Sequence, residues 1–176
     1  KGIPSAMVMA VVHSLFHSIS GRENNPSRIM QHLNEMSCEG NESNMLVTLF
    51  LGVLDLPTGR LRYCSAGHDH PLLVGETVTE LPVKACLPIG LFTDTKYETQ
   101  EFLLPPKTTI FLYTDGLTEA KNAAHKLFGL ARVQESLNNM KSCEPQMLVV
   151  QMKAEVHRFV EEAEQSEYLT MLAIRY

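Results

Sequence analysis

The first forty residues carry hydrophobic positions at helical spacing. Pro4 near the start and Gly21 just past the end bracket an apolar stretch, which predicts a helix of about four turns. Because apolar residues occur most of the way round this helix, we expect it to be buried on more than one side. A second helix, amphipathic and opened by Asn25, ends before Gly40.

From residue 45 the hydrophobic period changes to that of strands, and turn residues such as Pro57 and Gly59 separate the apolar runs. The helical period then returns in two segments, residues 127–137 and 144–163, before a last apolar run. The predicted strands are residues 45–55, 60–66, 71–74, 78–81, 97–104, 108–114 and 168–176. Helices segregated from antiparallel strands indicate an α+β layered sandwich rather than a parallel α/β sheet.

Composition and charge exclude several classes of function. Hydrophobic residues make up 44% of the 176 residues and charged residues 20%, as in a soluble globular domain. The net charge of −5 provides no basic field for nucleic acid. No apolar run reaches the roughly 18 residues that span a bilayer, and no signal peptide precedes the first helix. The four scattered cysteines form no CxxC motif, so we expect reduced thiols and a cytoplasmic location.

A carboxylate at the end of a buried strand is the most suggestive local feature. Asp115 directly follows the apolar run 108–114, and Gly116 follows it. A strand end holds a side chain rigidly, glycine permits close approach, and carboxylate oxygens suit Mg²⁺, Mn²⁺ or Ca²⁺. The alternative is that Asp115 caps the turn after the strand, as aspartate commonly does.

Histidines form two further candidate clusters. His68, Asp69 and His70 follow a predicted strand and have the residue types of a transition-metal site, or they form a loop that satisfies backbone groups. His13 and His17 have the i, i+4 spacing of a zinc pair on a helix, but no HExxH carboxylate accompanies them. On that helix, core histidines are the favoured interpretation.

The order of several segments resembles the metal-dependent protein phosphatases of the PPM type (type 2C), in their bacterial SpoIIE/RsbU-like branch. The resemblance covers essentially the whole chain. The segments that carry it are residues 1–10, 48–55, 58–73, 87–92, 112–120, 128–129 and 167–172. It implies a four-layer αββα sandwich of two mainly antiparallel sheets flanked by helices. Residues 1–176 would form one such domain, which lacks its N-terminal strand or strands because the chain begins at Lys1.

The resemblance also implies an activity. Members of this family hydrolyse phosphoserine or phosphothreonine in proteins, with two Mg²⁺ or Mn²⁺ ions that activate a water molecule. The usual substrate in this branch is a STAS-type antagonist of an anti-sigma factor. The domain is often the output of a longer signalling protein, so a sensor or receiver domain would precede it.

Individual site residues follow from the matched motifs. Asp115 matches the strand-end metal ligand, with Gly116 beside it. Lys1 and Gly2 belong to the glycine motif next to the principal ligand, so Gly2 is placed at the metal centre and Lys1 near it. Glu167 stands where the first aspartate of the final acidic pair is expected. His68 lies near the site without a metal role.

Two alternatives to the enzyme remain. Tyr168 replaces the second acidic residue of the final pair, which is compatible with a catalytically impaired pseudophosphatase that acts as a regulatory binding module. The other is a structural dimerisation domain, since the first two helices carry apolar residues that can pair in a homodimer. These residues are Met30, Leu33 and Met36.

Overall fold

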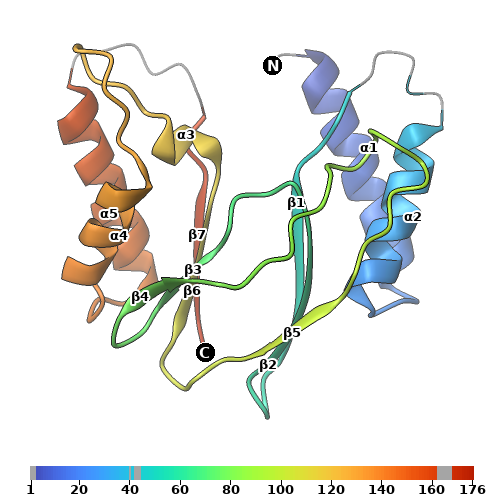
Figure 1. Ribbon diagram of the computed structural model, residues 1–176, viewed down its shortest axis with the longest axis horizontal. Helices are drawn as coiled ribbons and strands as arrows, with labels where there is room; N and C mark the ends of the chain where they lie inside the picture. Colours follow the sequence, from blue (N-terminus) through green and yellow to red (C-terminus); the bar gives the residue numbers. More distant parts are fainter. Residues whose placement is uncertain (1–2, 40, 42–44, 162–167) are drawn as a thin grey trace. The chain divides into compact units, whose positions relative to one another are not determined.

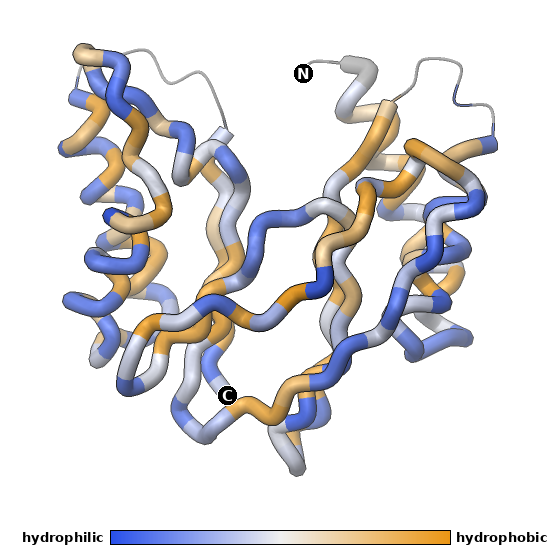
Figure 2. The backbone as a smooth tube through the Cα atoms, viewed as in Figure 1, coloured by the Kyte–Doolittle hydropathy of each residue, from blue (hydrophilic) through white to orange (hydrophobic). Residues whose placement is uncertain are grey.

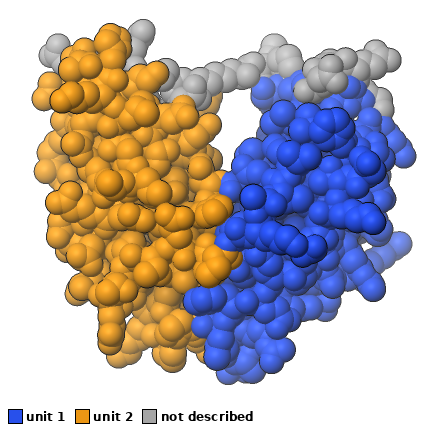
Figure 3. Space-filling model, in the orientation of Figure 1, with its two compact units in different colours: residues 1–68, 83–103 blue, residues 69–82, 104–176 orange. Residues whose placement is uncertain are grey.

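The order of elements follows the predicted change of hydrophobic period. The computed structural model describes residues 3–39, 41, 45–161 and 168–176. By their internal contacts these residues divide into two compact units (Figures 1 and 3). Unit 1 comprises residues 1–68 and 83–103, and unit 2 comprises residues 69–82 and 104–176.

Unit 1 is an antiparallel sheet with two helices. Helices α1 (Ile3–Ser20) and α2 (Pro26–Cys38) pack on the sheet β1-β2-β5, whose strands are β1 (Leu49–Asp55), β2 (Arg60–Ala66) and β5 (Gln100–Leu103). The β1–β2 hairpin pairs Leu49 with Ala66 and Asp55 with Arg60. The core forms where α2 meets β2, and its buried residues are Val12, Ile29, Met30, Leu33, Cys64, Ala66, Ile89 and Tyr97.

Unit 2 is also an antiparallel sheet with helices. Its strand order is β4-β3-β6-β7, with β3 at Leu72–Val74, β4 at Val78–Glu80, β6 at Thr109–Tyr113 and β7 at Met171–Arg175. The helices are α3 (Asp115–Thr118), α4 (Leu130–Asn139) and α5 (Pro145–Val160). Figure 2 shows hydrophobic and hydrophilic residues alternating along α4 and α5, as in helices with one buried face. The central strand β6 is buried along most of its length.

The predicted fold class is confirmed, because helices and two antiparallel sheets make up the described chain. Several predicted boundaries were too wide: β1 begins at Leu49 rather than residue 45, β5 covers only residues 100–103, and β7 begins at Met171 rather than residue 168. Residue 47 instead forms an isolated bridge to Ile89, which ends the regular pairing there. Among the described helices, none combines the length and the apolar character needed to cross a bilayer.

The prediction that α1 is buried on more than one side is wrong. A single stripe faces the core, formed by Val12 with the partly buried Val8, Leu15, Phe16 and Ile19. These positions recur at helical spacing, so the remaining faces point to solvent, and Met7 is 65% exposed. His13 and His17 are exposed as well, with ring centroids 4.6 Å apart, so they are not core histidines.

The predicted dimer surface also needs correction. Met30 and Leu33 are fully buried in the core of unit 1, because this side of α2 packs against β2. Of the three residues expected to pair in a homodimer, only Met36 is exposed. Met30 and Leu33 therefore stabilise the fold of unit 1 rather than offering an association surface.

Candidate functional site

Strand β6 carries Asp115 to the end of the sheet in unit 2. Thr114 has an extended backbone at the start of α3, and Asp115 is the first helical residue. Gly116 and Leu117 are buried, whereas Asp115 is exposed. Because Leu117 anchors the short helix in the core, the carboxylate of Asp115 is presented to solvent from a rigid support.

Thr114 ties this strand end to the segment that leads into β7. Its backbone N–H donates to the carbonyl of Thr170 at 3.2 Å, and its hydroxyl accepts the N–H of Thr170 at 3.3 Å. The hydroxyl also lies 3.3 Å from the carbonyl oxygen of Tyr168, to which it donates. Residues 168–170 therefore lie beside Thr114, the residue that precedes Asp115. Glu167, the second predicted ligand, lies outside the described residues, as do Lys1 and Gly2.

The carboxylate of Asp115 does not cap the turn. Within the described part of the chain it accepts no hydrogen bond and forms no ion pair. Only the backbone carbonyl of Asp115 is bonded, to the N–H of Glu119 at 2.8 Å and the hydroxyl of Thr118 at 3.3 Å. The capping alternative lacks its hydrogen bond, and both carboxylate oxygens are available to a ligand such as a hard cation.

The cluster His68, Asp69 and His70 does not form a metal site. Nδ1 of His70 lies 3.3 Å from a carboxylate oxygen of Glu80, and His68 packs near the ring of Phe50. No group of three or more histidine, cysteine or acidic residues in the described ranges is arranged to hold a metal ion. The loop interpretation is the one that fits.

Negative charges near this loop affect a tyrosine of β6, the strand that precedes Asp115. Burial, together with the negative charges of Asp69 and Glu80, raises the pKa of Tyr113 to about 12. Tyr113 is the last residue of β6, and it therefore stays neutral at physiological pH. The buried Tyr113 thus adds no negative charge beside Asp115, whose carboxylate is exposed.

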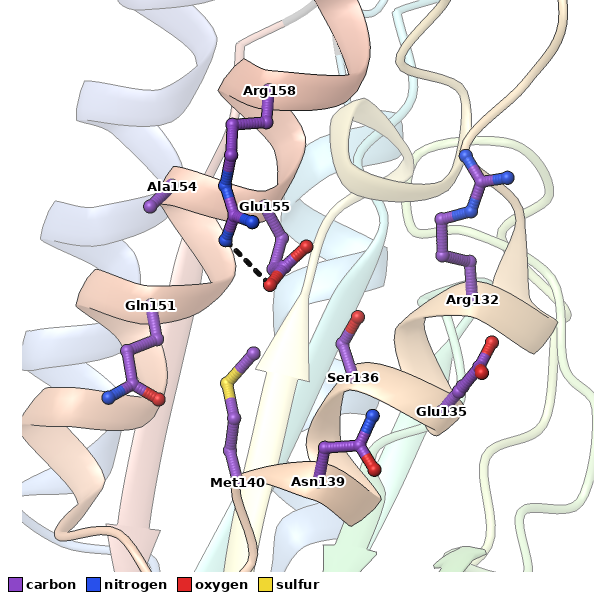
Figure 4. A pocket seen from close by; sticks show the side chains of 9 residues that line it. All are labelled: Arg132, Glu135, Ser136, Asn139, Met140, Gln151, Ala154, Glu155 and Arg158. Atoms are coloured by element: carbon purple, nitrogen blue, oxygen red, sulfur yellow. Dashed lines mark hydrogen bonds and ion pairs between the residues drawn. The ribbon is translucent and has the colours of Figure 1, made fainter.

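A polar pocket between α4 and α5 was not predicted. It has a volume of about 450 Å³ and contains an ion pair between Arg158 and Glu155 at 2.7 Å (Figure 4). Its residues look like ordinary solvent-facing helix positions in the sequence, so no motif indicated it. None of them belongs to β6 or α3. The lining residues are Arg132, Glu135, Ser136, Asn139, Met140, Gln151, Ala154, Glu155 and Arg158.

Comparison with known proteins decides the family. The family described as stage II sporulation protein E (SpoIIE) matches residues 1–176. The chain belongs to the SpoIIE family. The resemblance to PPM-type, SpoIIE/RsbU-like phosphatases is thereby confirmed.

Curated relatives are longer than this SpoIIE-family chain. Protein IcfG from Synechocystis sp. is 24% identical over 99% of the chain and 32% of its own length. The phosphoserine phosphatase RsbU from Bacillus subtilis is 27% identical over 69% of the chain and 37% of its own length. The chain thus spans about a third of the length of the curated relatives it matches.

Solved structures agree on the fold. The PP2C phosphatase domain of SpoIIE from Bacillus subtilis, solved with a fragment of its regulatory domain, has a TM-score of 0.85 at 17% identity. It covers 100% of this chain and 51% of its own. RsbX, solved in complex with magnesium, has a TM-score of 0.64 at 14% identity over 95% of this chain and 71% of its own. At these identities the likeness shows the fold alone.

Proposed function

We propose that residues 1–176 form a metal-dependent protein serine/threonine phosphatase domain. The observation that carries the proposal is the carboxylate of Asp115, exposed and without a partner among the described residues, at the end of a buried strand. A carboxylate held on a rigid support, with both oxygens open, has the preorganisation that a ligand site requires. Family membership identifies the chemistry for which the ligand is required.

Mg²⁺ or Mn²⁺ fits this carboxylate, because both ions prefer oxygen ligands. We assign Asp115 and Glu167 as the residues that hold the metal ions, with Gly2 at the same centre and Gly116 next to Asp115. When bound, a pair of such ions lowers the pKa of a water molecule and stabilises charge on phosphate oxygens. RsbX, which shares the fold, was solved in complex with magnesium, and this likeness supports a divalent ion here.

The residues of this chain would bind the metal ions and fix the geometry of the site. Asp115 holds charge at a fixed point because Leu117 anchors α3 from below. Thr114 positions residues 168–170, and this contact sets the path of the chain that follows Glu167. Lys1 and His68 would lie near the centre without binding metal. Catalytic geometry tolerates errors of only about 0.5 Å, so this support matters as much as the ligands.

The substrate in this proposal is a phosphoprotein that carries phosphoserine or phosphothreonine. A STAS-type antagonist of an anti-sigma factor is the most specific candidate, supported by the likeness to RsbU, which is named a phosphoserine phosphatase. The domain would act as the output of a longer bacterial signalling protein in the cytoplasm, with a sensor or receiver domain in the same chain. The greater length of the relatives supports this arrangement.

The test is phosphate release from p-nitrophenyl phosphate and from a phosphoserine protein of the STAS type, with Mn²⁺ or Mg²⁺. The proposal predicts release that EDTA abolishes and that added metal restores. If the protein releases no phosphate from either compound but still binds the phosphoprotein, the pseudophosphatase alternative replaces the enzyme. If it neither hydrolyses nor binds these compounds, the proposal is wrong.

A further inference from the structure

A short hairpin projects from the end of α3, the helix that begins with Asp115. We call residues 120–128 the basic hairpin (Figure 1). Two backbone hydrogen bonds hold its base together. The N–H of Gly129 donates to the carbonyl of Thr118, the last residue of α3, at 2.9 Å, and the N–H of Phe128 donates to the carbonyl of Ala120 at 2.8 Å. Phe128 is buried in the core of unit 2. The hairpin therefore has a fixed position relative to Asp115.

The tip of the basic hairpin is equally well defined. Oδ1 of Asn122 accepts the N–H groups of Ala124 at 3.1 Å and Lys126 at 3.0 Å, and the N–H of Asn122 donates to the carbonyl of Lys126 at 3.1 Å. His125 adopts a left-handed backbone with φ of 57°, a conformation that costs energy in a residue other than glycine. The tip is therefore held by its own hydrogen bonds.

The charge of this segment opposes that of the chain. Residues 120–134 contain Lys121, Lys126 and Arg132 but no acidic residue, whereas the whole chain has a net charge of −5. Lys121, His125 and Lys126 are exposed, and in the described ranges none of them forms an ion pair. The guanidinium carbon of Arg132 lies 4.3 Å from the ring centroid of Phe159 on α5 and 5.5 Å from that of Phe128, so this charge stands between α5 and the base of the hairpin.

We propose that the basic hairpin is a docking surface for an acidic stretch of the phosphoprotein substrate. The inference rests on the proposed function and adds to it a preference for acidic residues beside the phosphorylated side chain. Charge complementarity carries it: exposed cations without an ion pair among the described residues, on a rigid hairpin, attract carboxylates and reject basic sequences. The exposed Leu127, at 50%, adds an apolar contact within the same surface.

Binding of labelled phosphoserine peptides tests this surface. One peptide has aspartate and glutamate on both sides of the phosphoserine, and its partner has asparagine and glutamine instead. Fluorescence anisotropy is measured on the Asp115→Asn protein, which keeps the peptides intact. At about 0.05 M salt we expect the acidic peptide to bind roughly tenfold more tightly than the neutral one, and about 0.5 M salt should remove most of the difference.

Charge reversal at Lys121→Glu/Lys126→Glu should abolish the preference. Lys107→Glu/Lys153→Glu is the matched control, because both lysines are exposed residues of unit 2 outside the basic hairpin. Circular dichroism establishes that both variants fold. If the hairpin variant keeps the preference, or the control loses it, the docking surface is elsewhere. Failure of the proposed function would instead appear as absence of phosphate release by the unaltered protein.

Discussion

Replacing Asn34 should destabilise unit 1 strongly. This residue lies on α2 and is fully buried. Its Oδ1 accepts the buried N–H of Gly90 at 3.0 Å, and its Nδ2 donates to the carbonyl of Phe92 at 2.9 Å. The side chain thus joins α2 to the segment after residue 87. Asn34→Leu keeps a similar volume and removes every hydrogen bond.

The size of the effect follows from the groups left without partners. In Asn34→Leu the N–H of Gly90 loses its acceptor. The side chain of Asn41 also contacts Gly90, but its Nδ2 donates to the carbonyl of Gly90 and leaves the N–H unbonded. A buried polar group without a partner costs about 1–3 kcal/mol. The carbonyl of Phe92 is only partly buried, and water can reach it. We therefore expect Asn34→Leu to lower the free energy of unfolding by about 1–3 kcal/mol.

Urea unfolding measures this loss, and hydrogen exchange locates it. Asn138→Leu on the exposed face of α4 is the matched control, and it should change stability by less than about 0.5 kcal/mol. The amide of Gly90 should exchange faster in Asn34→Leu than in the unaltered protein. A loss below about 0.5 kcal/mol for Asn34→Leu, equal to the control, would refute the reasoning.

Further predictions concern Thr114, the thiol of Cys64 and the pair Glu167 and Tyr168. Thr114→Val removes the two hydrogen bonds of the hydroxyl, to the carbonyl of Tyr168 and from the N–H of Thr170, and keeps the backbone bond to Thr170. It should therefore weaken Mn²⁺ binding measured by calorimetry, while Thr114→Ser retains it. Burial, with a smaller contribution from Cys86, raises the pKa of the Cys64 thiol to about 12, so this thiol should react last with a disulfide reagent at pH 8. Because the folded state keeps a proton that the unfolded state loses from pH 9 upward, stability should fall between pH 9 and about 12, and less so in Cys64→Ala. The double change Glu167→Asp/Tyr168→Asp should alter phosphate release by less than about tenfold, whereas a rise from no activity would favour a native pseudophosphatase.

Most of the fold was predictable because the hydrophobic period is local. The hairpin of β1 and β2 and the buried strand β6 follow from runs of neighbouring residues. The burial of α1 was not predictable in the same way. Alanine, methionine and valine fill every position from residue 6 to residue 12 of this helix, so the sequence does not show which stripe packs. Only the tertiary contacts select the stripe around Val12.

In the candidate site, too, local features were predictable and long-range contacts were not. Asp115 was identifiable, because a carboxylate between a buried strand and glycine is a local pattern. The contact of Thr114 with Tyr168 joins residues 54 positions apart, and no local pattern reveals it. The burial of Asn34 was partly predictable, because it lies four positions after Met30 on the apolar face of α2. Its hydrogen-bond partners were not predictable from the spacing of apolar residues. Paired buried amides of this kind need the structure to find their partners.

Titration of the protein with Mn²⁺ by calorimetry, with and without the change Asp115→Asn, tests the central claim most directly. Asparagine keeps the shape of the side chain and removes its charge, and because the carboxylate has no partner among the described residues, stability should change by less than about 1 kcal/mol. We predict that the unaltered protein binds Mn²⁺ and that Asp115→Asn lowers the affinity at least about tenfold. Equal affinity in the two proteins, with both folded, would contradict a metal centre at the end of β6.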